Sequence, residues 1–166
     1  MSFPRLLATW FGAGLLRPAP GTWGSAVAVA LGLLIHGIGH FPLLLAATLI
    51  VTPIGFWATA KTVEGQEEKD PSEIVIDEVA GQWIALLFPS AGFWLMGLDS
   101  WTFPWPGWVA AFLFFRLFDI WKPGRIGRAD RKHTAFGTME DDLWAGLFAG
   151  IATMIAAGLA HGVMGA

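Results

Sequence analysis

Five long apolar runs, each bounded by charged or turn-forming residues, dominate the chain. They cover residues 22–39, 41–60, 74–97, 105–121 and 143–164. Each run approaches the ~20 residues that an α-helix needs to cross the ~30 Å hydrocarbon core of a bilayer. The pattern predicts an all-α, polytopic membrane bundle of about five transmembrane helices, which forms a single domain over residues 1–166.

The polar residues at the ends of these runs predict where the helices begin. We expect the third helix to begin at Asp70-Pro71-Ser72-Glu73, where Asp70 can cap the helix and Pro71 fits its first turn. This start would place Asp77 about six residues, or roughly 9 Å, along the helix axis. Thr22 and Thr138 are the expected caps of the first and fifth helices.

A shorter apolar pattern precedes the first long run. Hydrophobic residues recur at helical spacing over residues 3–14. A short amphipathic helix of this kind can lie in the plane of the membrane interface. We therefore expect an N-terminal interfacial helix on the inner surface.

The composition supports a membrane protein and excludes several other classes. The hydrophobic fraction is 55%, the charged fraction is 14%, and there is no cysteine among the 166 residues. The mean hydropathy is +0.58. A disordered chain, a disulfide-stapled module and a nucleic-acid binder with a basic surface are excluded. The absence of cysteine also excludes thiolate catalysis and cysteine-based zinc sites.

The basic residues orient the predicted helices in the membrane. All ten Lys and Arg residues fall on one side of the five-span arrangement. Cytoplasmic loops carry an excess of Lys and Arg, so this side is expected to face the cytoplasm. One missed or additional crossing would scatter the basic residues over both faces.

Acidic residues lie within the apolar helices, where a charge needs a partner. Twelve of the thirteen acids share the side of the bases, and Asp99 alone lies on the other. A carboxylate in an apolar helix is costly unless it faces cations, water or a metal. Three helices supply such acids at one membrane depth: Asp77, Glu78, Asp119, Asp141 and Asp142.

These five carboxylates would repel one another unless cations neutralise them. Oxygen-only ligands favour Mg²⁺ or Mn²⁺ over zinc. Arg116, Asp119 and Lys122 recur at i, i+3 and i+6, and form one polar stripe on an apolar helix. Each group also has a structural interpretation: Arg116 and Asp119 can form an ion pair, and Asp141 can favour a helix N-terminus.

The stretch over residues 18–25 provides a possible anion site. Exposed amides at a helix start can bind an anion, and glycines allow close approach of the ligand. An ordinary loop-to-helix turn is the alternative interpretation. The candidate phosphate-binding residues of this stretch are Gly21, Thr22, Gly24 and Ser25.

Three blocks of sequence resemble the phosphatidylglycerophosphatase A family. They are Ala19-Pro20-Gly21-Thr22 with Gly24-Ser25, then residues 74–81 (IVIDEVAG), then residues 115–123 (FRLFDIWKP) followed by residues 139–146 (MEDDLWAG). The resemblance implies a Mg²⁺-dependent lipid phosphatase of the bacterial inner membrane, with its active site at the cytoplasmic face. Such enzymes convert phosphatidylglycerophosphate to phosphatidylglycerol and inorganic phosphate, and no obligate protein partner is evident.

The same resemblance assigns roles to individual residues. It implies that Asp77, Glu78, Asp119, Asp141 and Asp142 are catalytic and hold one or two Mg²⁺ ions, with Arg116 and Lys122 beside the phosphate. The attacking group can be water or a carboxylate. The stretch over residues 133–137 is less glycine-rich than the family pattern, so no role follows for His133. The alternative functions are a divalent-cation transporter, a phosphatase of another lipid phosphomonoester, and a non-catalytic scaffold.

Overall fold

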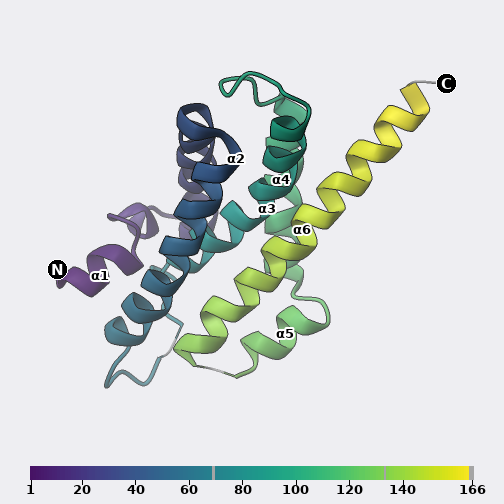
Figure 1. Ribbon diagram of the computed structural model, residues 1–166. Helices are drawn as coiled ribbons and strands as arrows, with labels where there is room; N and C mark the ends of the chain where they lie inside the picture. The colour runs from purple at the N-terminus through teal and green to yellow at the C-terminus, as the bar shows by residue number, and fades with distance from the viewer. Residues whose placement is uncertain (69, 133, 165–166) are drawn as a thin grey trace.

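The computed structural model describes residues 1–68, 70–132 and 134–164, and it contains helices and no strand over these ranges. The elements are α1 (Phe3–Ala8), the 3₁₀ helix η1 (Ala13–Leu15), α2 (Pro20–Thr62), α3 (Ile76–Leu95), α4 (Trp105–Trp121), α5 (Arg125–Asp130) and α6 (Ala135–Met164). The predicted all-α class is confirmed. Helices α3, α4 and α6 pack together, and the C-terminal part of α6 extends beyond the body of the molecule (Figure 1).

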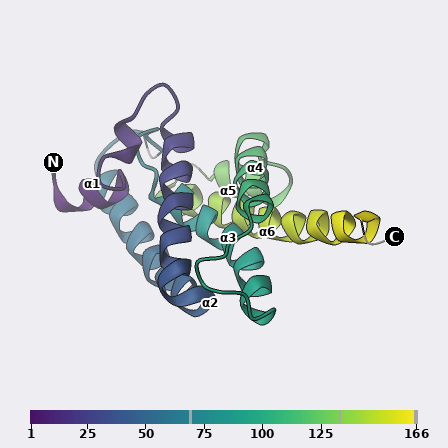
Figure 2. The same ribbon diagram turned by 90° about the horizontal axis from the view of Figure 1, so that it is seen from above.

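Helix α2 is broken in the middle. Gly39 and His40 have non-helical backbone angles, and His40 has a φ of 55°. The two halves meet at this break and diverge as a V when viewed from above (Figure 2). The break lies between the first two predicted segments, 22–39 and 41–60. The fourth predicted segment, 105–121, coincides with α4.

Two helices are long and apolar enough, by length and composition, to cross a membrane among the described residues: α2 and α6. Helix α4 has 17 residues, somewhat fewer than the ~20 of a typical span. Helix α3 has 20 residues, but its first turn carries Asp77 and Glu78. The long apolar helices are thus confirmed, whereas five crossings stay a prediction.

Helix α3 begins later than the capping pattern at Asp70 predicts. The helix begins at Ile76 rather than at Asp70, so Asp77 lies in its first turn and not six residues in. The preceding residues are held by the N-terminal segment instead, because the Val75 N–H donates to the Ala8 carbonyl at 2.9 Å. Gly14 also approaches this loop closely, since a Cβ on it would lie 2.0 Å from the Glu73 carbonyl oxygen.

The starts of α2 and α6 also differ from the expected caps. Helix α2 begins at Pro20 with Ala19 at its N-cap, so Thr22 lies in the first turn and caps nothing. Helix α6 begins at Ala135 rather than near residue 143. Thr134 supplies its cap, because its Oγ1 accepts a hydrogen bond from the Gly137 N–H at 3.0 Å, and Thr138 lies inside the helix.

The N-terminal helix is shorter than predicted. Helix α1 ends at Ala8, and Trp10 and Phe11 then adopt positive φ angles of 46° and 54° before η1. Phe3 and Phe11 are exposed, which agrees with an apolar outer face on this segment. Its position on a membrane surface stays a prediction.

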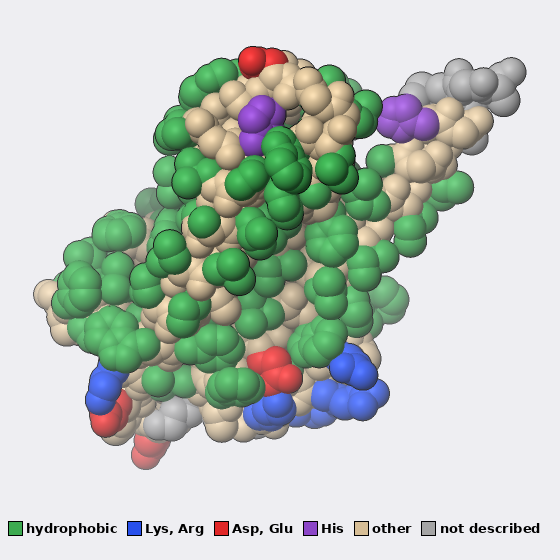
Figure 3. Space-filling view, in the orientation of Figure 1, with side chains coloured by type: hydrophobic (Ala, Val, Ile, Leu, Met, Phe, Trp, Pro, Cys, Tyr) green, Lys and Arg blue, Asp and Glu red, His purple; other side chains and the backbone are tan. Residues whose placement is uncertain are grey.

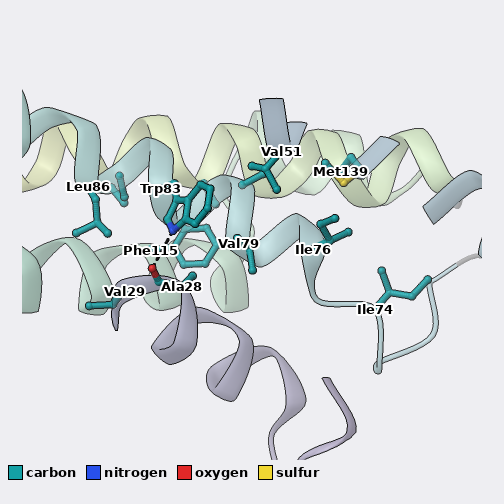
Figure 4. Close-up of a cluster of buried hydrophobic side chains, with 14 of the residues drawn as sticks. Ala28, Val29, Val51, Ile74, Ile76, Val79, Trp83, Leu86, Phe115 and Met139 are labelled. Carbon is teal, nitrogen blue, oxygen red and sulfur yellow. Dashed lines mark hydrogen bonds between the residues drawn. The ribbon is translucent and has the colours of Figure 1, made fainter. Parts of the chain in front are cut away.

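A buried apolar cluster fixes the helices around α3. Ile76, Val79, Leu86 and Phe115 are fully buried within it. The Trp83 Nε1–H, which points toward the first half of α2, donates to the Ala28 carbonyl at 2.8 Å (Figure 4). Because α3 is the central element of this cluster, the position of its first turn is tightly defined.

Candidate active site

The close crossing of α3 and α6 determines where their acidic residues lie. A Cβ on Gly146 would lie 2.2 Å from the Gly81 carbonyl oxygen, and a Cβ on Gly81 would lie 2.4 Å from the Asp142 carbonyl oxygen. Real Cβ atoms are not found this close to backbone atoms, so only glycine fits at either position. Asp77 lies one turn before Gly81, and Asp142 lies one turn before Gly146. The glycine contact therefore brings the two acidic turns together.

Three carboxylates meet at this crossing. Oxygen atoms of Asp77, Glu78 and Asp142 all lie within 4.8 Å of one another. Asp77 and Asp142 are each only 4% exposed. The Oε2 atom of Glu78 is buried and has no hydrogen-bond partner within the described residues. We refer to these three residues as the carboxylate trio.

The trio fits a hard divalent cation. Three carboxylate oxygens at this spacing are the donor type that Mg²⁺ prefers, and Glu78 Oε2 is a buried acceptor with an unused lone pair. Without a cation, three negative charges at this spacing would repel one another strongly. Asp77, Glu78 and Asp142 are therefore the residues best placed to hold a metal ion.

The first turn of α2 lies next to Glu78 of the trio. A Cβ on Gly21 would lie 2.2 Å from Glu78 Oε1, so the glycine lets the Glu78 carboxylate lie close to the helix start. Ala19, at the N-cap, contributes no side-chain hydrogen bond to the helix end. The first-turn amides of Gly21 and Thr22 are thus available to an anion.

Gly24 and Ser25, which the sequence predicts as phosphate-binding residues, do not line the cavity. A Cβ on Gly24 would lie 2.7 Å from the Val75 Cβ, so this glycine serves helix packing. Ser25 is fully buried, and its hydroxyl donates to the Gly21 carbonyl at 2.8 Å. The Arg116 Nη1–H donates to the Ser25 Oγ at 3.4 Å, so Ser25 contacts the arginine.

Arg116 and Asp119, one turn apart on α4, form a largely buried ion pair. Their side chains are 16% and 13% exposed. The Arg116 Nε is buried and has no partner within the described part of the chain. Asp119 lines the same cavity, but it faces Arg116 and does not belong to the trio.

Lys122 connects α4, α5 and α6. Its ammonium lies 2.6 Å from Asp130 Oδ1 and 2.8 Å from Asp141 Oδ2. Partial burial disfavours the charged form of Lys122, but the hydrogen bonds to Asp130 and Asp141 outweigh it and raise its pKa above the ordinary value. The five predicted carboxylates are therefore divided: three form the trio, Asp119 pairs with Arg116, and Asp141 pairs with Lys122.

A cavity of about 330 Å³ opens between these groups. Nine of the predicted site residues line it: Gly21, Thr22, Asp77, Glu78, Arg116, Asp119, Lys122, Asp141 and Asp142. The structure adds lining residues that sequence reasoning did not assign to the site: Ala19, Pro20, Asp70, Ser72, Ile74 and Thr138. His133 lies outside the described residues.

Asp70 is the acidic residue among the lining residues that the sequence does not assign to the site. Burial raises its pKa above the ordinary value, Lys122 opposes this shift, and the carboxylates of Asp130 and Asp119 reinforce it. Its position before Pro71 indicated a helix cap, and no local pattern separates a cap from a cavity residue. The proximity of Asp70 to Asp119 and Asp130 follows only from the packing of three segments.

The basic residues gather at one end of a largely apolar surface. The Lys and Arg side chains visible in Figure 3 lie at the lower end of the molecule, and hydrophobic side chains cover most of the remaining surface. Fold, surface and cavity together define an all-helical, membrane-associated enzyme with an acidic cavity flanked by an arginine and a lysine.

The chain belongs to the phosphatidylglycerophosphatase A family. It matches the family model described as phosphatidylglycerophosphatase A over residues 6–157. It is 37% identical to the phosphatidylglycerophosphatase A of Haemophilus influenzae over 147 residues, which cover 87% of this chain and 82% of the relative. The corresponding protein of Escherichia coli K12 is 35% identical over 150 residues, or 89% and 80% of the two chains.

A third relative carries a different name. The putative phosphatidylinositol-3-phosphatase of Bacteroides thetaiotaomicron is 34% identical over 158 residues, which cover 92% of both chains. No solved structure shows significant similarity. The resemblance inferred from the three sequence blocks is thus confirmed at the level of the family.

Proposed function

We propose that this protein hydrolyses the terminal phosphomonoester of phosphatidylglycerophosphate to yield phosphatidylglycerol and inorganic phosphate. The observation that carries the proposal is the carboxylate trio, which shares one cavity with Arg116 and Lys122. Two relatives named phosphatidylglycerophosphatase A cover most of the chain and support this substrate. A cation-binding acidic centre beside two phosphate-facing cations is suited to phosphoryl transfer.

The side chains around the cavity have distinct roles in this proposal. Arg116, Lys122 and the first-turn amides of α2 bind the phosphate oxygens and stabilise the charge that develops in the transition state. The bond between phosphorus and the glycerol oxygen breaks, and a bond between phosphorus and the attacking oxygen forms. Asp77, Glu78 and Asp142 would hold Mg²⁺, which when bound supplies Lewis-acid stabilisation and lowers the pKa of a water molecule.

The proposed orientation places the cavity at the cytoplasmic face of the bacterial inner membrane. Five crossings would comprise the two halves of α2, then α3, α4 and α6. The gathering of Lys and Arg at one end supports this arrangement. The acyl chains of the substrate would then stay in the bilayer while its headgroup enters the cavity.

Single cysteines test this topology, because the chain contains none of its own. We expect Asp99→Cys to react with an impermeant maleimide from the periplasmic side of intact cells. Arg128→Cys should react only after the inner membrane is opened. Labelling of both positions from the same side would contradict five crossings.

The substrate test compares three lipid phosphomonoesters. Purified protein in detergent with Mg²⁺ should release phosphate from phosphatidylglycerophosphate at a kcat/KM at least about tenfold above those for phosphatidylinositol-3-phosphate and phosphatidic acid, a difference of ~1.4 kcal/mol in transition-state binding. The second lipid is included because the relative from Bacteroides thetaiotaomicron is named for it. Faster release from phosphatidylinositol-3-phosphate would reassign the substrate and keep the chemistry.

A further inference from the structure

We propose that Asp130 is a positioning residue that holds the ammonium of Lys122 at the phosphate-binding side of the cavity. The inference rests on the proposed function, because it concerns how a phosphate-binding group is oriented. Asp130 does not line the cavity, whereas Lys122 and Asp141 do. Its effect on the reaction would therefore act through Lys122.

The hydrogen bonds of Lys122 leave one donor for a ligand. An ammonium has three N–H donors. One goes to Asp130 at 2.6 Å and one goes to Asp141 at 2.8 Å. The two carboxylates come from different helices, α5 and α6, and restrain the ammonium from two sides. The remaining N–H is available to a phosphate oxygen.

Helix α5 packs against the backbone of Lys122. Lys122 ends α4 in the left-handed conformation, with a φ of 50° and a ψ of 52°. A Cβ on Gly127 would lie 2.6 Å from the Lys122 carbonyl oxygen, so α5 packs directly on this turn. Ile126 and Ala129 are buried and anchor the helix. This packing brings Asp130, at the end of α5, to the Lys122 side chain.

Asp130 pairs with Lys122 rather than with the basic residues next to it in the sequence. Arg128 and Arg131 are close to it in sequence and are exposed. The hydrogen bond of Asp130 nevertheless goes to Lys122, eight residues away. Without Asp130, the ammonium would be held by Asp141 alone and would be drawn toward α6, next to Asp142 of the trio.

Two measurements on the same variants test this role. Asp130→Asn should raise KM about tenfold with kcat changed less than about threefold, since one charge-assisted hydrogen bond is lost. Asp130→Glu should restore most of the affinity. As a separate readout, brief acetylation with dilute acetic anhydride and mass spectrometry should show faster modification of Lys122 in Asp130→Asn than in the wild type, measured as the fraction of Lys122 acetylated after a fixed time.

Glu64→Gln is the matched control. It removes the carboxylate partner of Lys61, an exposed pair far from α5 in sequence, and should leave Lys122 acetylation and KM unchanged. Unchanged Lys122 acetylation in Asp130→Asn, or identical behaviour of Asp130→Asn and Asp130→Glu, would overturn the proposal. If the wild type released no lipid phosphate, the proposed function would fail, whereas the acetylation readout would still decide the role of Asp130.

Discussion

Asp77→Asn and Asp142→Asn are each expected to lower kcat/KM for phosphatidylglycerophosphate by at least about 10³-fold, or ~4 kcal/mol of transition-state stabilisation. Each substitution keeps the size of the side chain and removes one negative charge from the carboxylate trio. Asn retains one oxygen, so the loss reports the charge rather than the shape. Glu78→Gln is expected to behave in the same way.

The effect on stability should have the opposite sign when no divalent cation is present. Asp77 and Asp142 are buried with Glu78, so neutralising one of them relieves repulsion. In EDTA, the variants should unfold at the same temperature as the wild type or higher. Mg²⁺ should raise the Tm of the wild type, because a ligand at 100 times its Kd stabilises by about 2.7 kcal/mol, and should raise that of Asp77→Asn much less.

Asp99→Asn is the control for these variants. It replaces an aspartate by an asparagine at a position that does not line the cavity. Its Oδ1 accepts a hydrogen bond from the Trp101 N–H at 2.9 Å, and an asparagine oxygen can accept the same bond. Activity and the Mg²⁺ response should match those of the wild type. A folded Asp77→Asn enzyme with full Mg²⁺-dependent activity would remove the trio from the mechanism.

Gly146→Ala is expected to cost activity and stability together. A Cβ at this position would lie 2.2 Å from the Gly81 carbonyl oxygen, and backbone atoms cannot move aside as a flexible side chain can. Overpacking of this kind typically costs about 1–3 kcal/mol. Separation of α3 from α6 would also move Asp142 away from Asp77, so phosphate release should fall at least about tenfold.

Gly158→Ala, on the same helix, is the matched control. A Cβ on Gly158 would have no neighbour within 4 Å among the described residues. Its Tm should equal or exceed that of the wild type, since Ala is a better helix former than Gly by about 1 kcal/mol. Equal Tm and equal phosphate release for Gly146→Ala and Gly158→Ala would contradict a close crossing of α3 and α6.

The long apolar helices and the acids that meet between them could be predicted from the sequence. Helix α4 has the predicted bounds, and the break in α2 lies at Gly39 and His40. Both features follow from local hydrophobicity and turn residues, which act within a few positions of the chain. The clustering of Asp77, Glu78 and Asp142 followed from the cost of carboxylates in apolar helices.

Features that depend on packing between distant segments could not be predicted in this way. The capping pattern at Asp70 was overridden because Val75 is hydrogen-bonded to Ala8. The short helix α5 carries too few residues for a periodic pattern, and it is held by buried Ile126 and by its contact with Lys122. The pairing of Gly81 with Gly146 becomes visible only when both helices are placed.

The different partners of the five predicted carboxylates also could not be predicted from the sequence. The sequence predicts Asp141 and Asp142 as equivalent members of one metal-binding set. Neighbouring residues on a helix point in directions about 100° apart, so Asp142 joins the trio while Asp141 faces Lys122. A count of carboxylates at one depth cannot distinguish these roles.

The most direct test of a cation-dependent lipid phosphatase is phosphate release from phosphatidylglycerophosphate by the purified wild type, measured in Mg²⁺, then in excess EDTA, then after Mg²⁺ is restored. We expect release in Mg²⁺, loss of at least about 10³-fold in EDTA, and recovery when Mg²⁺ returns. Undiminished release in EDTA would contradict a metal held by the carboxylate trio. Absence of release from a folded protein supplied with Mg²⁺ would contradict the proposed activity itself.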